Sequence, residues 1–219
     1  MEKMLIEVSL IDKMGSDLSV VNAARVSFAN KHEEFNDTKD TKLISFLAKH
    51  GHWSPFAHCS AQFHIRAPVF VARQLVKHQV GLSWNEISRR YVDQEVEIYE
   101  PKEWRARADN VKQGSSEDTV EVGDHYHDAI KQAKRSYEKL LVQGVAPEMA
   151  RMVLPQAMMT EWYWSGSLYA FARVCNLRLD KTAQQETQWV AEEISTQIKP
   201  HFPQSWKYLT EETNGIPGH

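Results

Sequence analysis

The period of the hydrophobic positions changes along the chain, and each period predicts a different kind of element. Residues 59–66 alternate strictly. Cysteine and apolar side chains occupy the odd positions, and polar side chains occupy the even positions. This period of two is typical of a strand with one buried face. The apolar-rich residues 4–11 predict a second strand, at the edge of a sheet.

Helical spacing of apolar residues covers more of the sequence than the strand pattern does. Glycine, proline and an N-capping aspartate, Asp180, mark where these helices begin and end. The pattern predicts helices at residues 17–28, 43–50, 68–80, 129–143, 147–154, 162–176 and 180–199. Polar and turn-forming residues predict a loop at 30–40, an irregular segment at 81–90 and a surface excursion at 101–123.

The balance of these elements favours an α+β fold with more helix than strand. A chain of 219 residues is long enough to bury one full hydrophobic core. No internal repeat or low-complexity segment divides it. We therefore expect a single domain over residues 1–219, with 101–123 on its surface.

Composition narrows the class of protein. A net charge of -3 and a pI near 6.4 disfavour binding to nucleic acid through a basic surface. No apolar run reaches the length of a membrane span, and the N-terminal residues do not have the pattern of a secretory signal. Two cysteines are too few for a disulfide framework. We expect a soluble cytoplasmic protein with no membrane or nucleic-acid partner.

The densest polar cluster lies at residues 73–91. Cations that follow a helix, together with nearby hydroxyl groups, suit a bound phosphate. A solvated charged surface is the alternative interpretation. The cluster contains Arg73, Lys77, Ser83, Asn85, Glu86, Ser88, Arg89 and Arg90.

Arg151 and Arg178 each lie within an apolar stretch, ARMVLP and NLRLD. Arginine is rarely buried without a partner, so each is expected to meet an anion or a carboxylate at an interface. A structural salt bridge is the alternative for each residue.

Other chemistry finds less support. The histidines at 50–58 and 125–127 lack the spacing of a metal site, so we expect turn and surface histidines and no metal. Cys59 and Cys175 lie among apolar residues and are expected to be core side chains rather than nucleophiles. The aromatic residues at 162–164 and Tyr169 are open to two interpretations, stacking on a planar cofactor or packing in a core or interface. No glycine-rich dinucleotide or Walker motif is present.

The chain resembles the flavin-dependent thymidylate synthases. Their signature is Arg-His-Arg, two residues, Ser-x-Asn-Glu-x-Ser-x-Arg-Tyr, and residues 83–91, SWNEISRRY, match its second half in full. Residues 77–79, Lys-His-Gln, keep only the histidine of the triplet, and one extra residue precedes the serine. Further similar segments occur in family order, at residues 22–28, 49–58, 63–74, 150–155 and 176–180.

The resemblance implies a helix-rich α+β subunit with a small, mainly antiparallel sheet, assembled as a homotetramer with active sites shared between chains. It implies conversion of dUMP to dTMP, with methylenetetrahydrofolate as carbon donor, NADPH as reductant and bound FAD as hydride donor. Such an enzyme needs no cysteine nucleophile, in agreement with the interpretation of Cys59 and Cys175.

The resemblance also implies site residues. Arg178 would be catalytic, contacting the pyrimidine and stabilising negative charge on its ring. The remaining nucleotide-binding residues would be Gln74, Lys77, Glu86, Ser88, Arg89, Arg90 and Arg151. Cofactor-binding residues would be His52, Ser54, Lys77, His78, Gln79, Asn85, Glu86, Ser167, Tyr169 and Arg173.

Departures from the family pattern suggest two hypotheses. Gln79 lacks the charge of the family arginine, and Arg173 stands where a polar residue is common, so Arg173 is hypothesised to restore a cofactor-facing charge. Glu161 replaces a residue that is often basic, and an acid near the ring would suit the exocyclic amine of dCMP. The alternatives to dUMP methylation are therefore methylation or hydroxymethylation of another deoxypyrimidine monophosphate, and a non-catalytic protein that binds nucleotide or flavin.

Overall fold

A four-stranded sheet forms the centre of the computed structural model, which describes residues 6–88, 90, 95–109 and 114–210. Its strands lie in the order β1-β2-β6-β3, and every neighbouring pair is antiparallel. Their bounds are Glu7–Met14 for β1, Ser60–Pro68 for β2, Leu82–Glu86 for β3 and Met159–Ser167 for β6. The sheet confirms the predicted α+β class, and β1 is the edge strand that the sequence predicts.

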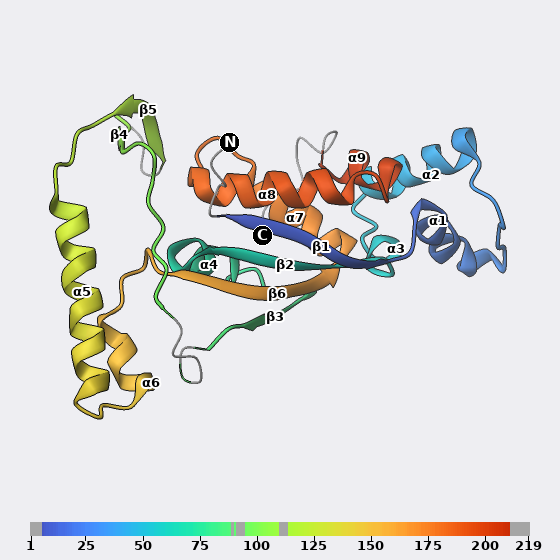
Figure 1. Ribbon diagram of the computed structural model, residues 1–219. Coiled ribbons are helices and arrows are strands. Elements are labelled where there is room, and N and C mark those ends of the chain that lie inside the picture. The colour runs from blue at the N-terminus through green and yellow to red at the C-terminus, as the bar shows by residue number, and fades with distance from the viewer. Residues whose placement is uncertain (1–5, 89, 91–94, 110–113, 211–219) are drawn as a thin grey trace.

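Strand register divides the sheet into two faces. Phe63, Ile65, Trp162 and Trp164 are buried, and they lie opposite one another across β2 and β6. Successive residues of a strand point to opposite faces, so the polar residues between them lie on the other face. The buried face packs against α7 (Leu168–Arg178) and α8 (Gln185–Ile198), with α4 (Val69–Leu75) beside them (Figure 1).

A second group of helices lies at one end of this layer (Figure 1). α1 (Asp17–Arg25) starts at a capping box formed by Ser16 and Ser19, and η1 (Val26–Phe28) follows it. Asn36 accepts a hydrogen bond from the Lys39 backbone N–H and so caps the next helix. That helix is α2 (Asp37–Lys49), which packs against α9 (Pro203–Thr210), while α3 (Ser54–Ala57) packs against α1.

An arm projects from the sheet (Figure 1). It consists of α5 (His125–Val142), α6 (Pro147–Ala150) and η2 (Arg151–Val153), and it has a small apolar cluster around Val96, Tyr137 and Ala150. Before the arm, β4 (Arg105–Arg107) and β5 (Ser115–Thr119) form a separate two-stranded sheet within the predicted surface excursion.

Several predicted elements are wrong in type. Residues 162–167 are strand rather than helix, because Trp162 and Trp164 face the core while Tyr163 is exposed. Residues 82–86 form β3 rather than an irregular segment, because they pair with β6 along their whole length. The predicted loop at 30–40 ends early, since α2 begins at Asp37.

Two helix boundaries are also wrong. The helix predicted at 68–80 ends at Leu75, so Lys77 and His78 do not share helix faces with residues one turn earlier. Asp180 does not cap α8: its carboxylate accepts from Thr182, and Gln184 is the N-cap. The pattern also missed the short helices α3 and α9.

Candidate active site

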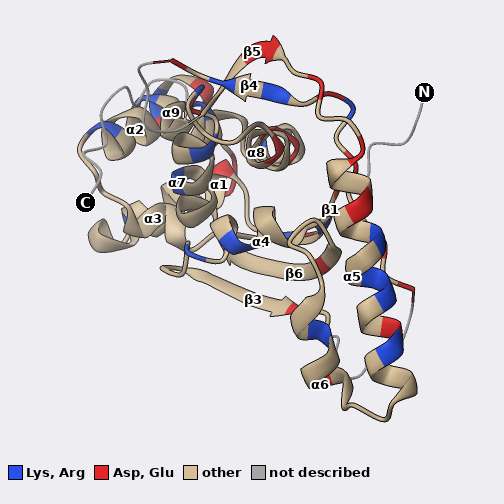
Figure 2. Cartoon of the chain, turned by 90° about the vertical axis from the view of Figure 1, so that its left-hand side faces the viewer, with Lys and Arg blue, Asp and Glu red and all other residues tan. Residues whose placement is uncertain are grey.

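A cavity of about 270 Å³ lies where the end of β3 meets the turn after α6. In Figure 2 the end of β3 is red, for an acidic residue, and the nearby turn is blue, for a basic residue. Glu86 and Arg151, both predicted from the sequence, line the cavity and are exposed. The other lining residues are Val69, Ile87, Leu154, Pro155, Gln156, Met158, Met159 and Thr160.

The carboxylate of Glu86 is held from two strands. Oε1 accepts a hydrogen bond from the Thr160 hydroxyl at 2.7 Å, and Oε2 accepts from the indole N–H of Trp84 at 3.2 Å. Sequence analysis missed Thr160, because the contact depends on the pairing of β3 with β6, which lie 74 residues apart at this point.

Arg151 is the cation at the cavity. Its Nε donates to the backbone carbonyl of Glu148 at 3.3 Å. Among the residues that the structure describes, no carboxylate pairs with Arg151 or Arg178, so the salt-bridge interpretation is not realised there. The terminal nitrogens of Arg151 are thus available for an anion in the cavity.

Arg178, the last residue of α7, contacts a neutral group. Its Nε donates to Nε2 of His78 at 2.9 Å. Burial, and then the positive charges of Arg178 and Arg173, lower the pKa of His78 to about 4. The imidazole is therefore neutral at pH 7, with its proton on Nδ1, and it orients the guanidinium without cancelling its charge.

The segment from His78 to Gly81 runs along α7. At the start of α7, the Ser167 backbone N–H donates to the Gly81 carbonyl at 3.1 Å, and the Ser167 hydroxyl caps the helix. A Cβ on Gly81 would meet the Ala170 side chain at 3.1 Å, and its φ of +77° favours glycine. His78, the middle residue of the divergent triplet, thus contacts the helix that carries Arg173 and Arg178.

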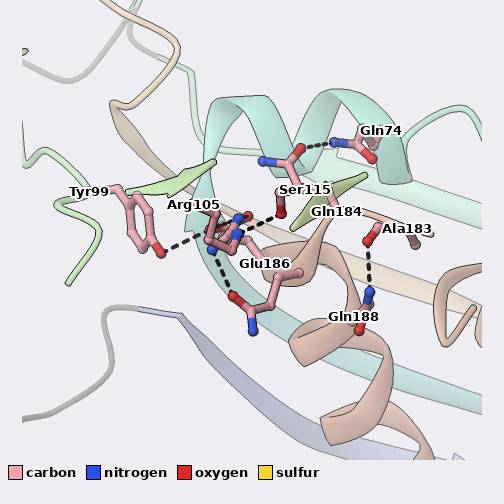
Figure 3. Close-up of polar contacts among 9 residues, drawn as sticks. Gln74, Tyr99, Arg105, Ser115, Ala183, Gln184, Glu186 and Gln188 are labelled. Carbon is pink, nitrogen blue, oxygen red and sulfur yellow. Dashed lines mark hydrogen bonds and ion pairs between the residues drawn. The ribbon is translucent and has the colours of Figure 1, made fainter. Parts of the chain in front are cut away.

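Gln74 belongs to a polar network between α4 and α8 (Figure 3). Its amide donates to the side chain of Gln184, the N-cap of α8. At the start of α8, the buried carboxylate of Glu186 accepts from the guanidinium of Arg105, at 2.8 and 3.0 Å. This ion pair attaches β4 to the start of α8. Glu186 lies two residues after Gln184, to which Gln74 donates.

A third group of predicted residues surrounds Trp53. His52 lies beside Phe46, with ring centroids 5.8 Å apart, and Ser54 begins α3. The exposed ring of Trp53 lies 6.3 Å from that of Tyr169, near the start of α7. These polar and aromatic groups suit a planar cofactor with polar substituents.

The other predicted residues lie at the surface. Lys77, Gln79 and Asn85 are exposed. Ser88 accepts two hydrogen bonds from Arg90, at 3.3 Å from the backbone N–H and 3.2 Å from Nε. Arg89 is outside the described residues.

Glu161 does not lie with the cavity residues. It is the neighbour of Thr160 on β6, so it points to the opposite face of the sheet, where its carboxylate lies 3.3 Å from Nε2 of His64. The structure therefore gives no support at this cavity to the hypothesis that Glu161 accepts from the base, and that hypothesis stays a prediction.

The two cysteines have no nucleophilic character. Burial raises the pKa of the Cys59 thiol to about 11, and burial also raises the pKa of Cys175. Both side chains lie in the hydrophobic core, as predicted. Among the described residues, no group of three or more histidine, cysteine or acidic side chains has the geometry to hold a metal ion. No helix in the described part of the chain is long and apolar enough to cross a membrane.

Comparison with known proteins gives a consistent result. Residues 9–204 match the family described as thymidylate synthase complementing protein. The flavin-dependent thymidylate synthase of Thermus thermophilus is 39% identical over 206 residues, which cover 93% of this chain and 75% of the relative. The enzyme of the same name from Thermotoga neapolitana is 38% identical over 201 residues, covering 92% and 88%.

Solved structures show the same fold. The UMP/dUMP methylase PolB from Streptomyces cacaoi, bound with 5-Br dUMP, has a TM-score of 0.81 and 31% identity. The similarity covers 93% of this chain and 94% of that one.

Proposed function

The chain belongs to the thymidylate synthase complementing protein family, and we propose that it is a flavin-dependent thymidylate synthase that converts dUMP to dTMP by reductive methylation. The observation that carries this proposal is the state of two arginines. Arg151 at the cavity and Arg178 beside a neutral histidine have no carboxylate partner among the described residues. Both charges are available to an anionic substrate.

The cavity suits a nucleoside monophosphate with a defined orientation. The phosphate binds at Arg151, because a guanidinium forms charge-assisted, bidentate contacts with phosphate oxygens. Glu86 repels the phosphate and accepts from the N–H or O–H groups of the nucleoside. Gln74, Lys77, Ser88, Arg89 and Arg90 complete the nucleotide-binding set, as the family resemblance implies.

Arg178 stabilises negative charge on the pyrimidine ring. A cation that is already oriented contributes more to a transition state than one that must reorganise. His78 provides that orientation through Nε2 while remaining neutral. The protein therefore polarises the base electrostatically and uses no cysteine.

Several of the FAD-binding residues that the family resemblance implies lie on or beside α7, and their polar and aromatic side chains suit FAD. We assign FAD to three groups of residues. His52 and Ser54 flank Trp53, and Ser167, Tyr169 and Arg173 lie on or beside α7. The third group consists of Lys77, His78, Gln79, Asn85 and Glu86. When bound, the flavin supplies the hydride, as flavin cofactors do. Arg173 lies close enough to His78 to lower the pKa of its imidazole, so it brings positive charge to the region where Gln79 lacks it.

We further propose that methylenetetrahydrofolate donates the carbon and NADPH reduces the flavin, in a homotetramer of the cytoplasm. The site residues form three groups, at the cavity, along α7 and around Trp53. Glu86, Arg151 and Trp53 are exposed in the single chain, and a site completed by neighbouring chains accounts for this exposure.

Product analysis tests the proposal. Purified protein receives FAD, NADPH, methylenetetrahydrofolate and equal amounts of dUMP and dCMP without oxygen, and the nucleotides are identified by mass spectrometry. We expect dTMP and unchanged dCMP. A methylated or hydroxymethylated cytosine nucleotide, or consumption of neither nucleotide with FAD bound, would contradict the proposal.

A further inference from the structure

We propose that Thr160 and Trp84 are positioning residues that hold the carboxylate of Glu86 toward the cavity and so fix how the nucleoside binds. This inference rests on the proposed function, because it assigns Glu86 to substrate. It adds Thr160 and Trp84 to the site as residues that affect the substrate only by orienting Glu86.

The first argument is the geometry of the carboxylate. One donor reaches each oxygen, Thr160 at 2.7 Å on Oε1 and Trp84 at 3.2 Å on Oε2. The donors come from different strands, β6 and β3, which are paired in register beside them. Two fixed donors on two oxygens set the rotation of the carboxylate plane as well as its position. Each oxygen keeps acceptor capacity for a ligand.

The second argument is the rigidity of the donors. Thr160 is only 5% exposed, so its hydroxyl has little access to water and is satisfied by Glu86. The ring of Trp84 stacks on the buried ring of Trp162, with centroids 4.4 Å apart and an angle of 17° between planes. Turning Trp84 away would break this ring stack, and turning the Thr160 hydroxyl away would remove its hydrogen bond to Glu86.

The third argument is that Glu86 does not need Thr160 and Trp84 for its own solvation. Glu86 is exposed, and an exposed carboxylate is well solvated without protein donors. Two structured donors directed at an exposed acid on a cavity wall therefore serve the orientation of that acid. They keep acceptor oxygens toward the donors of a nucleoside, while the cation at Arg151 stands at the same cavity for the phosphate.

Isosteric variants separate this role from a structural one. Thr160→Val removes the hydroxyl and keeps the shape, Thr160→Ser keeps the hydroxyl, and Trp84→Phe keeps the ring stack without the N–H. We expect Thr160→Val to lower kcat/KM for dUMP about tenfold, which corresponds to about 1.4 kcal/mol. Trp84→Phe is expected to lower it severalfold, and Thr160→Ser to stay within about twofold of wild type.

A Glu86→Ala background shows whether these residues act through Glu86. There, Thr160→Val should lower kcat/KM no further. Equal tenfold losses in both backgrounds, or a wild-type kcat/KM for Thr160→Val, would overturn the proposal. Thermal unfolding of each variant identifies losses that come from folding.

The Trp84 indole resonance in ¹⁵N NMR tests the hydrogen bond without turnover. We expect it to move in Glu86→Ala and in Thr160→Val, but not in Thr160→Ser. An unchanged resonance in all three variants would overturn the positioning role. If the wild-type protein fails to convert dUMP while the variants show these shifts, only the proposed function is contradicted.

Discussion

Arg178 ends α7 and Arg105 contacts the start of α8, and the two arginines have opposite surroundings. Arg105 donates to Ser115 at 2.9 Å, to Gln185 at 2.7 Å and to both oxygens of the buried Glu186 (Figure 3). Arg178 donates through Nε to a neutral imidazole. Glu186 neutralises the charge of Arg105, whereas no carboxylate of the described residues pairs with Arg178.

The difference shows how one residue type serves two purposes. A buried carboxylate is costly unless a cation pairs with it, so Arg105 is required by Glu186 and attaches β4 to α8. A neutral acceptor orients a guanidinium and leaves its charge for something outside the chain. Arg105 therefore has a structural role, and we propose that Arg178 is directed at a ligand.

The largest effect is expected from Arg178→Met. Removing a cation that stabilises charge in the transition state should lower kcat for dUMP by about 10²- to 10³-fold. The unfolding midpoint should change little, because no buried carboxylate loses a partner. Steady-state kinetics and a thermal melt on the same preparation measure both. A variant that unfolds early but retains kcat would reverse the assignment of the two arginines.

Arg105→Met should have the next largest effect, on stability. It leaves Glu186, which is 3% exposed, without its cation, at a cost of about 3 kcal/mol. Urea unfolding measures this loss. The control is the double variant Arg105→Met/Glu186→Leu, which should recover much of it, because no buried charge remains. A single variant as stable as wild type would show that the ion pair does not attach the hairpin.

A smaller effect should appear in the pH dependence of stability. The pKa of His78 is about 4 in the folded protein and near 6.5 when unperturbed. The unfolded chain therefore binds this proton first as the pH falls, so stability decreases between pH 6.5 and 4 and is unaffected above that window. His78→Gln keeps an acceptor that does not titrate. Its midpoint should fall less steeply over this window than that of wild type, and parallel curves would contradict the account.

The sequence predicted the fold where pattern and burial agree. The strand at 59–66 alternates between apolar and polar residues, and it is β2. β6 escaped notice because its alternation lies within a run of aromatics: Trp162 is 1% exposed and Tyr163 is 47% exposed. Composition cannot distinguish buried from exposed aromatic residues, and only pairing with β2 and β3 determines which ones face the core.

The candidate site was predictable to the same extent. Glu86, Arg151 and Arg178 lie in recognisable segments, and the two arginines also stand out as charges within apolar stretches. Thr160 and Gln184 could not be found, because their contacts with Glu86 and Gln74 depend on strand register and on the packing of α8. The face on which Glu161 lies could not be predicted for the same reason, since one residue along a strand changes the face.

Binding of dUMP tests the central claim most directly. Calorimetry at a temperature where all proteins are folded compares wild type, Arg151→Met and Arg105→Met. The loss of charge-assisted bonds to the phosphate should weaken binding by about 10- to 100-fold in Arg151→Met, whereas Arg105→Met should stay within about twofold of wild type. Equal Kd values for wild type and Arg151→Met, or a selective loss in Arg105→Met, would contradict the claim that the substrate binds to cations that lack a carboxylate partner in the described part of the chain.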